Sequence, residues 1–319
     1  MTPFNRREAV TLIGAAIGAS TSSVLAHAQE PRLAFMTAGQ GSAFLPYGQG
    51  IAKVLAAAGL NQIDVMESKG SNENLSSVDA SPTVIGLAFL GSALDALNGT
   101  GFAAGKRHEN VRALFPMYET AFMTAALASR GVTSMTALNG MRVGCGPPRG
   151  PAEDYFRAVI EVTGTTATIV SGTPSEQVKQ LLNGEIDAFW QGGSVPIPSL
   201  VSVANAAECI VFGLSPIEIA AQSKRFTFMT NATYPAGTYR AQTNQIDTVA
   251  AWNIAIAHKD LDEGIAYRIT KTVLSQQNLA ATVGAAAGST LAANATKNTV
   301  VPYHVGARRA LAELGVSLP

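Results

Sequence analysis

The chain has 319 residues, with 22 Lys and Arg against 22 Asp and Glu, so its formal net charge is zero. Charged residues make up only 14% and hydrophobic residues 47%, which excludes an intrinsically disordered protein. The lack of a basic excess argues against a nucleic-acid-binding protein, which must neutralise phosphates. At about 150 residues per domain, the length predicts two domains, each with its own hydrophobic core.

The first 28 residues have the pattern of an export signal rather than of a folded segment. Arg6 and Arg7 give a positive start, residues 9–20 form a short apolar stretch, and Ala26-His27-Ala28 is an A-x-A cleavage site. The paired arginines leave both twin-arginine and general secretory export open. The alternative, an N-terminal membrane anchor, is disfavoured because the apolar stretch is short. We expect a mature periplasmic protein that does not itself span the membrane.

From residue 29 onwards one unit recurs, made of a short apolar strand, a glycine-containing turn and a helix. The expected strands are residues 33–37, 63–67, 83–89, 142–145, 167–171 and 187–190. The third of these is nearly all apolar, as strands buried in parallel sheets are. Strands that alternate with helices in two sets predict two doubly wound α/β lobes.

Helix boundary signals support this pattern. Thr173-Pro174-Ser175-Glu176 is a capping box with proline at the first helical position, and Asn183-Gly184 closes that helix. Pro151 opens another helix that ends near Gly164. Helices are also expected over about 260–277 and 306–314, whereas the Ala/Gly-rich residues 285–288 have no clear assignment.

Two long β-like runs, residues 121–128 and 248–257, interrupt the repeating unit. Their positions predict two segments that cross between the lobes, so the first lobe would be discontinuous. We expect a signal peptide over 1–28, a first lobe made of 29–121 and 246–319, and a second lobe made of 122–245.

The catalytic and metal-binding motifs that we sought are absent from the sequence. The histidines are scattered without ligand spacing, and no zinc-protease, nucleophile-elbow or phosphate-loop motif occurs. Cys145 and Cys209 lie in apolar runs without a C-x-x-C spacing. An oxidising compartment permits a disulfide between them, but the apolar runs favour two buried free thiols. We therefore predict no catalytic residue, no metal and no cofactor.

The turns after the strands indicate a ligand site. In open parallel sheets ligands bind beyond the carboxyl ends of the strands, and here those ends are rich in Gly, Ser, Asn and Thr. Small residues and helix N-termini favour an anion, and two such edges across a hinge form a cleft that can close on it. This favours a binding protein over an enzyme, although a periplasmic enzyme that uses Cys145 or a cleft histidine remains the alternative.

Eight candidate ligand-binding residues come from this geometry. Arg149 stands beside a helix N-terminus and is suited to hold a carboxylate through two hydrogen bonds, unless it pairs with Glu153 or Asp154. Five of the others have a structural alternative: helix capping for Ser42, Ser71 and Asn74, core packing for the tryptophan and a hinge role for the tyrosine. The seven other candidates are Gly41, Ser42, Ser71, Asn74, Tyr118, Trp190 and Gln191.

Six segments, in order along the chain, resemble the solute receptors of TRAP transporters of the TAXI type. They are Gly70-Ser71-x-Glu73-Asn74-Leu75, Tyr118-Glu119-x-Ala121-Phe122, Leu138-Asn139-Gly140-x-Arg142-Val143-x-x-Gly146-Pro147-Pro148, Gly184-Glu185-Ile186-Asp187-Ala188-Phe189, Ala266-Tyr267-x-Ile269-Thr270-Lys271 and Pro302-Tyr303-His304-x-Gly306-Ala307-x-Arg309. The resemblance implies a type II periplasmic binding-protein fold, a small organic anion with a carboxylate as ligand, and delivery to TRAP-type membrane permease subunits driven by an ion gradient. A nitrate- or sulfonate-type receptor of an ATP-driven transporter has the same fold and remains an alternative.

Two departures from the family pattern bear on the ligand. The first loop carries Phe44-Leu45 where the family has an aromatic pair with a tyrosine hydroxyl, and Leu90-Gly91-Ser92 replaces a segment with polar groups. Phe44 and Leu45 are therefore expected to line the pocket. Both departures favour a more apolar carboxylate over an acidic amino acid.

Overall fold

The computed structural model describes residues 31–60 and 62–318. The expected export signal, 1–28, lies outside the described residues. Residues 31–319 form one compact unit. Within the described ranges, no helix has both the length and the apolar composition needed to cross a membrane.

The described strands all join one sheet. They are β1 (Leu33–Met36), β2 (Ile63–Met66), β3 (Val84–Phe89), β4 (Val111–Leu127), β5 (Arg142–Gly144), β6 (Thr168–Val170), β7 (Ala188–Gly193), β8 (Cys209–Phe212), β9 (Thr230–Tyr234) and β10 (Ile246–His258). Their order is β2-β1-β3-β10-β4-β7-β5-β6, with β8 beside β4 and β9 beside β10. The six short strands expected from the sequence are confirmed within a few residues as β1 to β3 and β5 to β7, whereas the crossing strands β4 and β10 are longer than expected and β9 was not expected. β1 is parallel to β2 and β3, and β5 is parallel to β6 and β7, as the doubly wound pattern predicts.

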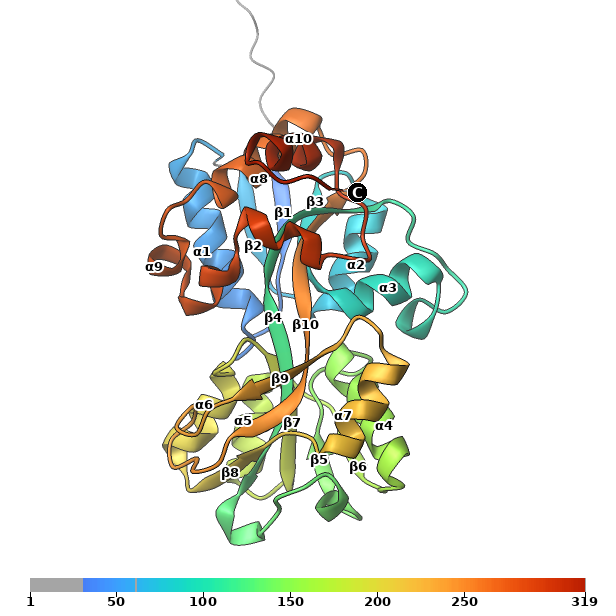
Figure 1. Cartoon of the computed structure of the whole chain (residues 1–319), viewed down its shortest axis with the longest axis vertical. Helices are drawn as coiled ribbons and strands as arrows, with labels where there is room; N and C mark the ends of the chain where they lie inside the picture. Colours follow the sequence, from blue (N-terminus) through green and yellow to red (C-terminus); the bar gives the residue numbers. More distant parts are fainter. Residues whose placement is uncertain (1–30, 61, 319) are drawn as a thin grey trace, which may run out of the picture. The chain divides into compact units, whose positions relative to one another are not determined.

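The two lobes share the long strands β4 and β10, which pair antiparallel and run through both of them (Figure 1). We call the lobe that contains β1–β3 the first lobe and the one that contains β5–β7 the second. Ala121 of β4 pairs with Ala250 of β10 and with Gly193 of β7. The hydrogen-bonded sheet therefore continues from one lobe into the other at this residue. Residues 246–250 of β10 pair with β9, so β10 enters the first lobe near Ala250.

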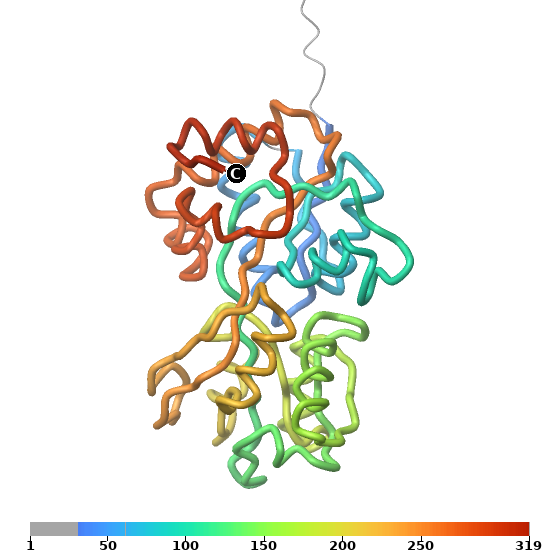
Figure 2. Tube along the Cα trace, turned by 45° about the vertical axis from the view of Figure 1, so that its right-hand side comes forward, coloured from blue at the N-terminus to red at the C-terminus, as the bar shows by residue number. Residues whose placement is uncertain are grey.

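Helices pack around the sheet in both lobes, as the tube in Figure 2 also shows. They are α1 (Phe44–Ala57), α2 (Ser71–Ala80), α3 (Leu90–Asn98), α4 (Pro151–Thr163), α5 (Pro174–Leu182), α6 (Pro198–Ala206), α7 (Pro216–Arg225), α8 (Glu263–Leu274), α9 (Leu279–Val283) and α10 (Val305–Glu313). Short 3₁₀ turns cover Gly101–Ala103, Ala128–Arg130, Thr136–Leu138, Ala285–Ser289 and Ala292–Lys297. The Ala/Gly-rich residues 285–288 therefore belong to a 3₁₀ turn.

The boundary signals in the sequence are confirmed. The Thr173 hydroxyl accepts from the Glu176 N–H while the Glu176 carboxylate accepts from the Thr173 N–H, which closes a capping box at α5. Pro151 is the first residue of α4, and Gly164 ends that helix in the left-handed conformation. α1 begins at Phe44, whose N–H donates to the Ser42 hydroxyl at 3.1 Å.

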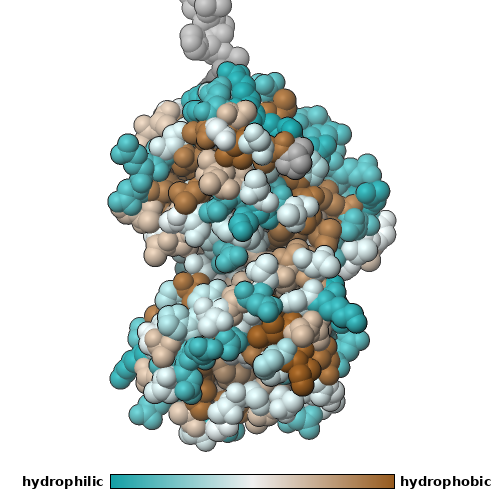
Figure 3. Space-filling model, viewed as in Figure 1, coloured by the Kyte–Doolittle hydropathy of each residue, from teal (hydrophilic) through white to brown (hydrophobic). Residues whose placement is uncertain are grey.

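Among the described residues, one core cluster lies in the first lobe and includes Phe35, Leu75 and Phe115, and two further clusters lie mainly in the second lobe. Hydrophilic residues cover much of the face shown in Figure 3, with hydrophobic residues in scattered groups between them. In the described part of the chain, the large apolar side chains that remain exposed are Met66, Val162, Ile217, Leu291 and Val305.

Candidate functional site

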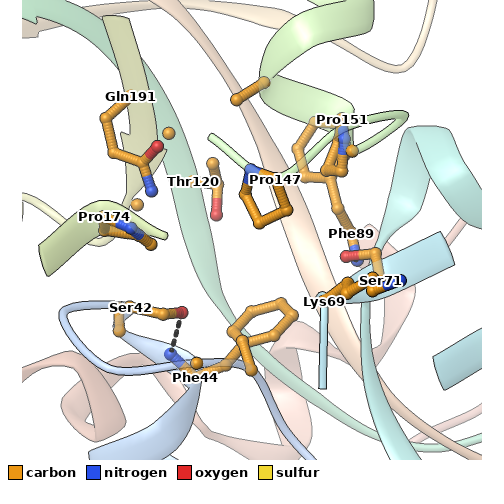
Figure 4. A pocket seen from close by; sticks show the side chains of 18 of the residues that line it. Ser42, Phe44, Lys69, Ser71, Phe89, Thr120, Pro147, Pro151, Pro174 and Gln191 are labelled. Atoms are coloured by element: carbon orange, nitrogen blue, oxygen red, sulfur yellow. Dashed lines mark hydrogen bonds between the residues drawn. The ribbon is translucent and has the colours of Figure 1, made fainter. Parts of the chain in front are cut away.

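A cavity of about 280 Å³ lies between the two lobes, where the turns that follow the strands meet. Its walls are mainly apolar, and Figure 4 shows side chains from both lobes converging on it. The apolar lining residues are Ala38, Ala43, Phe44, Phe89, Phe122, Pro147, Pro148, Pro151, Ala152 and Pro174. The polar ones are Ser42, Ser68, Lys69, Ser71, Tyr118, Thr120, Thr173, Glu176, Gln191 and Asn253.

Two serine hydroxyls lie at helix N-termini of the first lobe and face the cavity. Ser42 accepts a hydrogen bond from the Phe44 N–H at 3.1 Å, and Ser71 accepts one from the Phe89 N–H at 2.9 Å. Each hydroxyl therefore has one lone pair occupied and its own proton available. Both serine hydroxyls therefore accept from a backbone N–H and can still donate a hydrogen bond to a ligand.

Two residues of the cavity wall each carry a buried polar atom that has no hydrogen-bond partner in the described structure. These atoms are the Tyr118 hydroxyl and the Gln191 Oε1, and their residues are 2% and 8% exposed. Burial raises the pKa of Tyr118 well above its usual value, so the phenol stays protonated and able to donate. A buried polar atom without a partner costs free energy, and a ligand with matching groups would remove that cost.

β4 carries two bulges next to this site. The pairing register shifts between Trp252 and Ile254 and again between Ala255 and Ile256. Asn253 lies between Trp252 and Ile254, and its side-chain amide donates to the Tyr118 carbonyl at 2.7 Å and to the Thr120 hydroxyl at 2.8 Å. Bulges commonly redirect side chains beside functional sites, and here the Asn253 side chain ties β10 to the residues of β4 that line the cavity.

Only two of the described lining residues carry a charged side chain. Lys69 lies exposed on the turn before α2, and Glu176 lies exposed in the first turn of α5. The backbone and side-chain hydrogen bonds that Glu176 receives from Thr173 hold the pKa of its carboxyl below the usual value. The described cavity walls therefore combine uncharged buried groups with one exposed cation and one exposed carboxylate, whose Oε2 accepts from Thr173.

Of the ten residues predicted from the sequence, the structure brings five into the cavity wall. They are Ser42, Phe44, Ser71, Tyr118 and Gln191. Gly41, Leu45, Asn74, Arg149 and Trp190 are not among the lining residues.

Asn74 and Trp190 are turned into the protein to serve the fold. The Asn74 amide donates to the carbonyls of Thr37 and Leu87, both at 2.7 Å, and so ties α2 to β1 and β3. The Trp190 ring is buried and its Nε1–H donates to the Ala152 carbonyl at 2.9 Å. Its ring stacks on the ring of Phe122, which does line the cavity. Trp190 therefore packs against a residue of the cavity wall without lining the cavity itself.

Arg149, the residue predicted to hold a carboxylate, is exposed and lies outside the cavity lining. Its backbone adopts the left-handed conformation, with φ 59°. The backbone groups are occupied: the N–H donates to Glu153, and the carbonyl accepts from the Asn72 side chain of the first lobe at 2.5 Å. In this structure the backbone of Arg149 links the lobes, while the guanidinium takes no part in the cavity wall. Leu45 is buried within α1.

Glycines mark two further places where the lobes touch. A Cβ on Gly41, whose φ is +81°, would lie 2.9 Å from the Ser175 backbone nitrogen of α5. A Cβ on Gly91 would overlap the Tyr155 hydroxyl and lie 2.5 Å from the Phe228 ring. The rings of Phe89, Tyr155 and Phe228 pack edge to face around this second contact, so Gly91 allows aromatic groups of both lobes to approach closely.

Sequence reasoning missed several lining residues, of which Phe89, Phe122 and Asn253 are the most informative. Phe89 is the last residue of β3, so the rule that ligands bind at strand ends could have identified it. Asn253 is a polar residue within the apolar crossing run, and this exception to the pattern was a usable signal. Phe122 belongs to one of the segments that resemble the family, but the apolar run around it gives no sign that its ring faces the cavity.

Among the described residues, Cys145 and the histidines considered for catalysis do not line the cavity. Both cysteines are free thiols, and burial raises the pKa of Cys145 far above its usual value, which makes a reactive thiolate unfavourable. The His304 Nδ1 accepts from the Gly306 N–H at 3.2 Å and caps α10.

Two α/β lobes joined by antiparallel crossing strands, with a cavity between them, define a protein of the type II periplasmic binding-protein class. Solved structures of that kind match most of the chain at a TM-score of 0.56. MatC from Rhodopseudomonas palustris with bound malate is 11% identical and aligns over 89% of this chain and 96% of its own. The periplasmic binding protein BugD is 9% identical over 89% and 94%. No curated protein is similar enough in sequence to match.

The sequence comparison is more specific than the fold. The chain belongs to the NMT1-like family, whose model matches residues 35–315 and which corresponds to the solute-binding proteins of TAXI-type TRAP transporters. The resemblance found in the sequence is therefore confirmed, and the protein is a solute-binding component of a transporter.

Proposed function

We propose that this protein is the extracytoplasmic receptor of a TAXI-type TRAP transporter and that it binds a small carboxylate-bearing solute between its lobes. The observation that carries this proposal is the cavity itself. It is lined from both lobes, and the hydroxyl groups of Ser42, Ser71 and Tyr118 have protons to donate. A carboxylate offers only acceptors and matches such a set of donors.

The ligand acts in this proposal by stabilising the closed arrangement of the lobes. A solute that touches both lobes binds the closed form better and shifts the population towards it. The moving bodies are residues 29–121 with 246–319 and residues 122–245, and the permease recognises the closed form. No bond of the solute is made or broken, in keeping with the buried, protonated state of Cys145.

The proposed location is the periplasm, reached through the export signal expected over residues 1–28. Genes next to that of the receptor separate the two kinds of transporter. Integral membrane subunits without an ATPase identify a TRAP system, whereas an ATPase gene would identify the ATP-driven alternative and overturn this part of the proposal.

The ligand class is tested by thermal unfolding of the purified protein with a panel of small carboxylates, sugars and amines. A ligand present at 100 times its Kd stabilises the folded state by about 2.7 kcal/mol, which corresponds to a rise in Tm of roughly 5 °C or more. We expect at least one carboxylate to give such a rise. A response confined to sugars or amines contradicts the proposed ligand class.

A further inference from the structure

The hydrogen-bonding groups of the cavity are unevenly divided between donors and acceptors. The donors are the Ser42, Ser71 and Tyr118 hydroxyls and, at the rim, the Lys69 ammonium. Each serine oxygen has one lone pair engaged by a backbone N–H and keeps its O–H and one further lone pair for a ligand.

Acceptors are scarce among the described lining residues. Asn253 Oδ1 already accepts from the Thr120 hydroxyl at 3.1 Å, and Ser68 Oγ accepts from the Gly70 N–H at 3.0 Å. The Gln191 Oε1 is the buried acceptor that remains open. The one lining carboxylate, Glu176, is exposed at the rim and its Oε2 accepts from the N–H and the hydroxyl of Thr173 at 2.7 and 2.9 Å.

A solute that carries an ammonium group would therefore bury a positive charge without a carboxylate partner. Burial of an unpaired charge is strongly unfavourable, and neutral acceptors such as the Gln191 Oε1 and the serine hydroxyls supply no compensating negative charge. The nearby carboxylates of Asp95 and Asp154 are not among the residues that line the cavity.

The remaining wall is suited to an apolar body. Phe44, Phe89 and Phe122 contribute aromatic surface, and Pro147, Pro151 and Pro174 contribute rigid aliphatic surface. Figure 4 shows Phe44 on one side of the cavity, facing Pro147, with Phe89 beside Ser71. These surfaces stabilise a ligand by burying its hydrocarbon from water.

We infer that the pocket selects a carboxylic acid with an aromatic or branched aliphatic body and no ammonium group, and that it rejects the corresponding amino acid. This inference rests on the proposed function, because it assigns the solute class of the same cavity. The Tyr118 hydroxyl donates to an oxygen at the buried end of the ligand, and the serine hydroxyls with Lys69 face the outer end.

The test uses pairs of compounds that share a carbon skeleton and differ at the α-position. Isothermal titration calorimetry of the purified protein compares 4-methyl-2-oxopentanoate with leucine, and phenylpyruvate with phenylalanine. We expect an oxo acid of at least one pair to bind at least 100-fold more tightly than its amino acid. Equal affinities, or tighter binding of an amino acid such as leucine or glutamate, overturn the inference and leave the proposed receptor function intact.

Failure of both oxo acids to bind also overturns the inference. In that case the thermal-unfolding panel of carboxylates tests the proposed function. If another carboxylate raises the Tm, the proposed receptor function is supported. If no carboxylate raises the Tm, the proposed receptor function is refuted. The two failures are therefore distinguishable.

Two variants identify the groups responsible. Tyr118→Phe removes the buried hydroxyl and is expected to lower the affinity for the oxo acid at least 10-fold, since a hydrogen bond to a charged or polar ligand is lost. Glu176→Gln keeps the capping-box pattern but removes the rim charge, and should raise the affinity for the anion up to a few-fold. Measurable leucine or phenylalanine binding that Glu176→Gln abolishes would show that this carboxylate holds an ammonium group, and would refute the inference.

Discussion

Ser71 shows how a single side chain serves the fold and the site together. Its hydroxyl is buried at the N-terminus of α2 and accepts from the Phe89 N–H at the end of β3. That bond satisfies one of the backbone groups left open where β3 passes into α3. Because a hydroxyl that accepts still has a proton to donate, the structural bond positions the group that faces the cavity.

Replacement of Ser71 by alanine should therefore affect stability and binding together. The buried Phe89 N–H loses its acceptor, which costs about 1–3 kcal/mol, so Tm should fall by roughly 2–6 °C. The affinity for the best carboxylate of the panel should fall about 10-fold. Ser76→Ala, an exposed position in the same helix, is the control and should change neither quantity measurably.

At the scale of elements, the parallel pair β5 and β7 is joined at its start by a charged residue. Asp187 lies just before β7, and its carboxylate accepts from the backbone N–H and the side chain of Arg142, each at 3.0 Å. Arg130 approaches the same carboxylate at 3.3 Å. The hydrogen bonds from Arg142 lower the pKa of Asp187.

This lowered pKa determines the pH dependence of an Asp187→Asn variant. The folded-state pKa lies below the unfolded value, so the stabilisation is fully present above about pH 4 and is lost as the pH falls through the folded-state value. At pH 7 the variant should unfold roughly 4 °C below the wild type. The difference should shrink steadily in melts below pH 4.

Asp64 supplies the control for this prediction. It pairs with Arg32, but the two side chains are 42% and 67% exposed, whereas that of Asp187 is 13% exposed. Exposed pairs contribute little because water screens them, so Asp64→Asn should leave Tm unchanged within about 1 °C. A constant gap between Asp187→Asn and the wild type from pH 7 to pH 2 would contradict the electrostatic explanation.

For the whole molecule, the close approach of the lobes depends on Gly91. It is the second residue of α3 and its φ is not positive, so alanine suits the backbone and even favours the helix. The added methyl group would instead overlap the Tyr155 hydroxyl and the Phe228 ring of the other lobe. Gly91→Ala should therefore hinder closure and weaken binding of the best carboxylate about 10-fold, as measured by calorimetry.

Two comparisons test this explanation. Gly264→Ala makes the same change at the same helical position of α8, where the nearest atom outside the helix backbone is an Asp262 carboxylate oxygen at 3.1 Å, and it should leave affinity unchanged. Tyr155→Phe removes the overlapping oxygen and should restore part of the affinity when it is combined with Gly91→Ala. Equal losses of affinity for the Gly91 and Gly264 variants would show that contact between the lobes is not the cause.

Much of the fold could be predicted from the sequence because the relevant signals are local. Apolar runs place β1 to β3 and β5 to β7 within a few residues, and the capping box places the start of α5. The length of the crossing strands was underestimated, since β4 begins at Val111 and contains Pro116. A proline is tolerated there because it lies beside a bulge, and such a bulge depends on pairing with β10, which is distant in sequence.

The site was less predictable for a related reason. The strand-end rule identifies which turns meet at the cavity, but it does not say which way each side chain points. Ser71 and Asn74 are three residues apart on α2, yet one lines the cavity and the other binds two backbone carbonyls. Arg149 illustrates the same limit, because the left-handed backbone at this residue cannot be deduced from its type.

The position of β10 between β3 and β4 has a consequence for synthesis on the ribosome. All of β5 to β8 leave the ribosome before residues 246–258, so those strands can assemble while β3 still has an open edge and the start of β4 has no neighbouring strand. The sheet of the first lobe is therefore completed only when β10 has been synthesised, after the strands β5 to β8 of the second lobe. Its unpaired strand edges are the part of the nascent chain most exposed to misassembly, and a chaperone that holds the chain would have to cover them until β10 emerges.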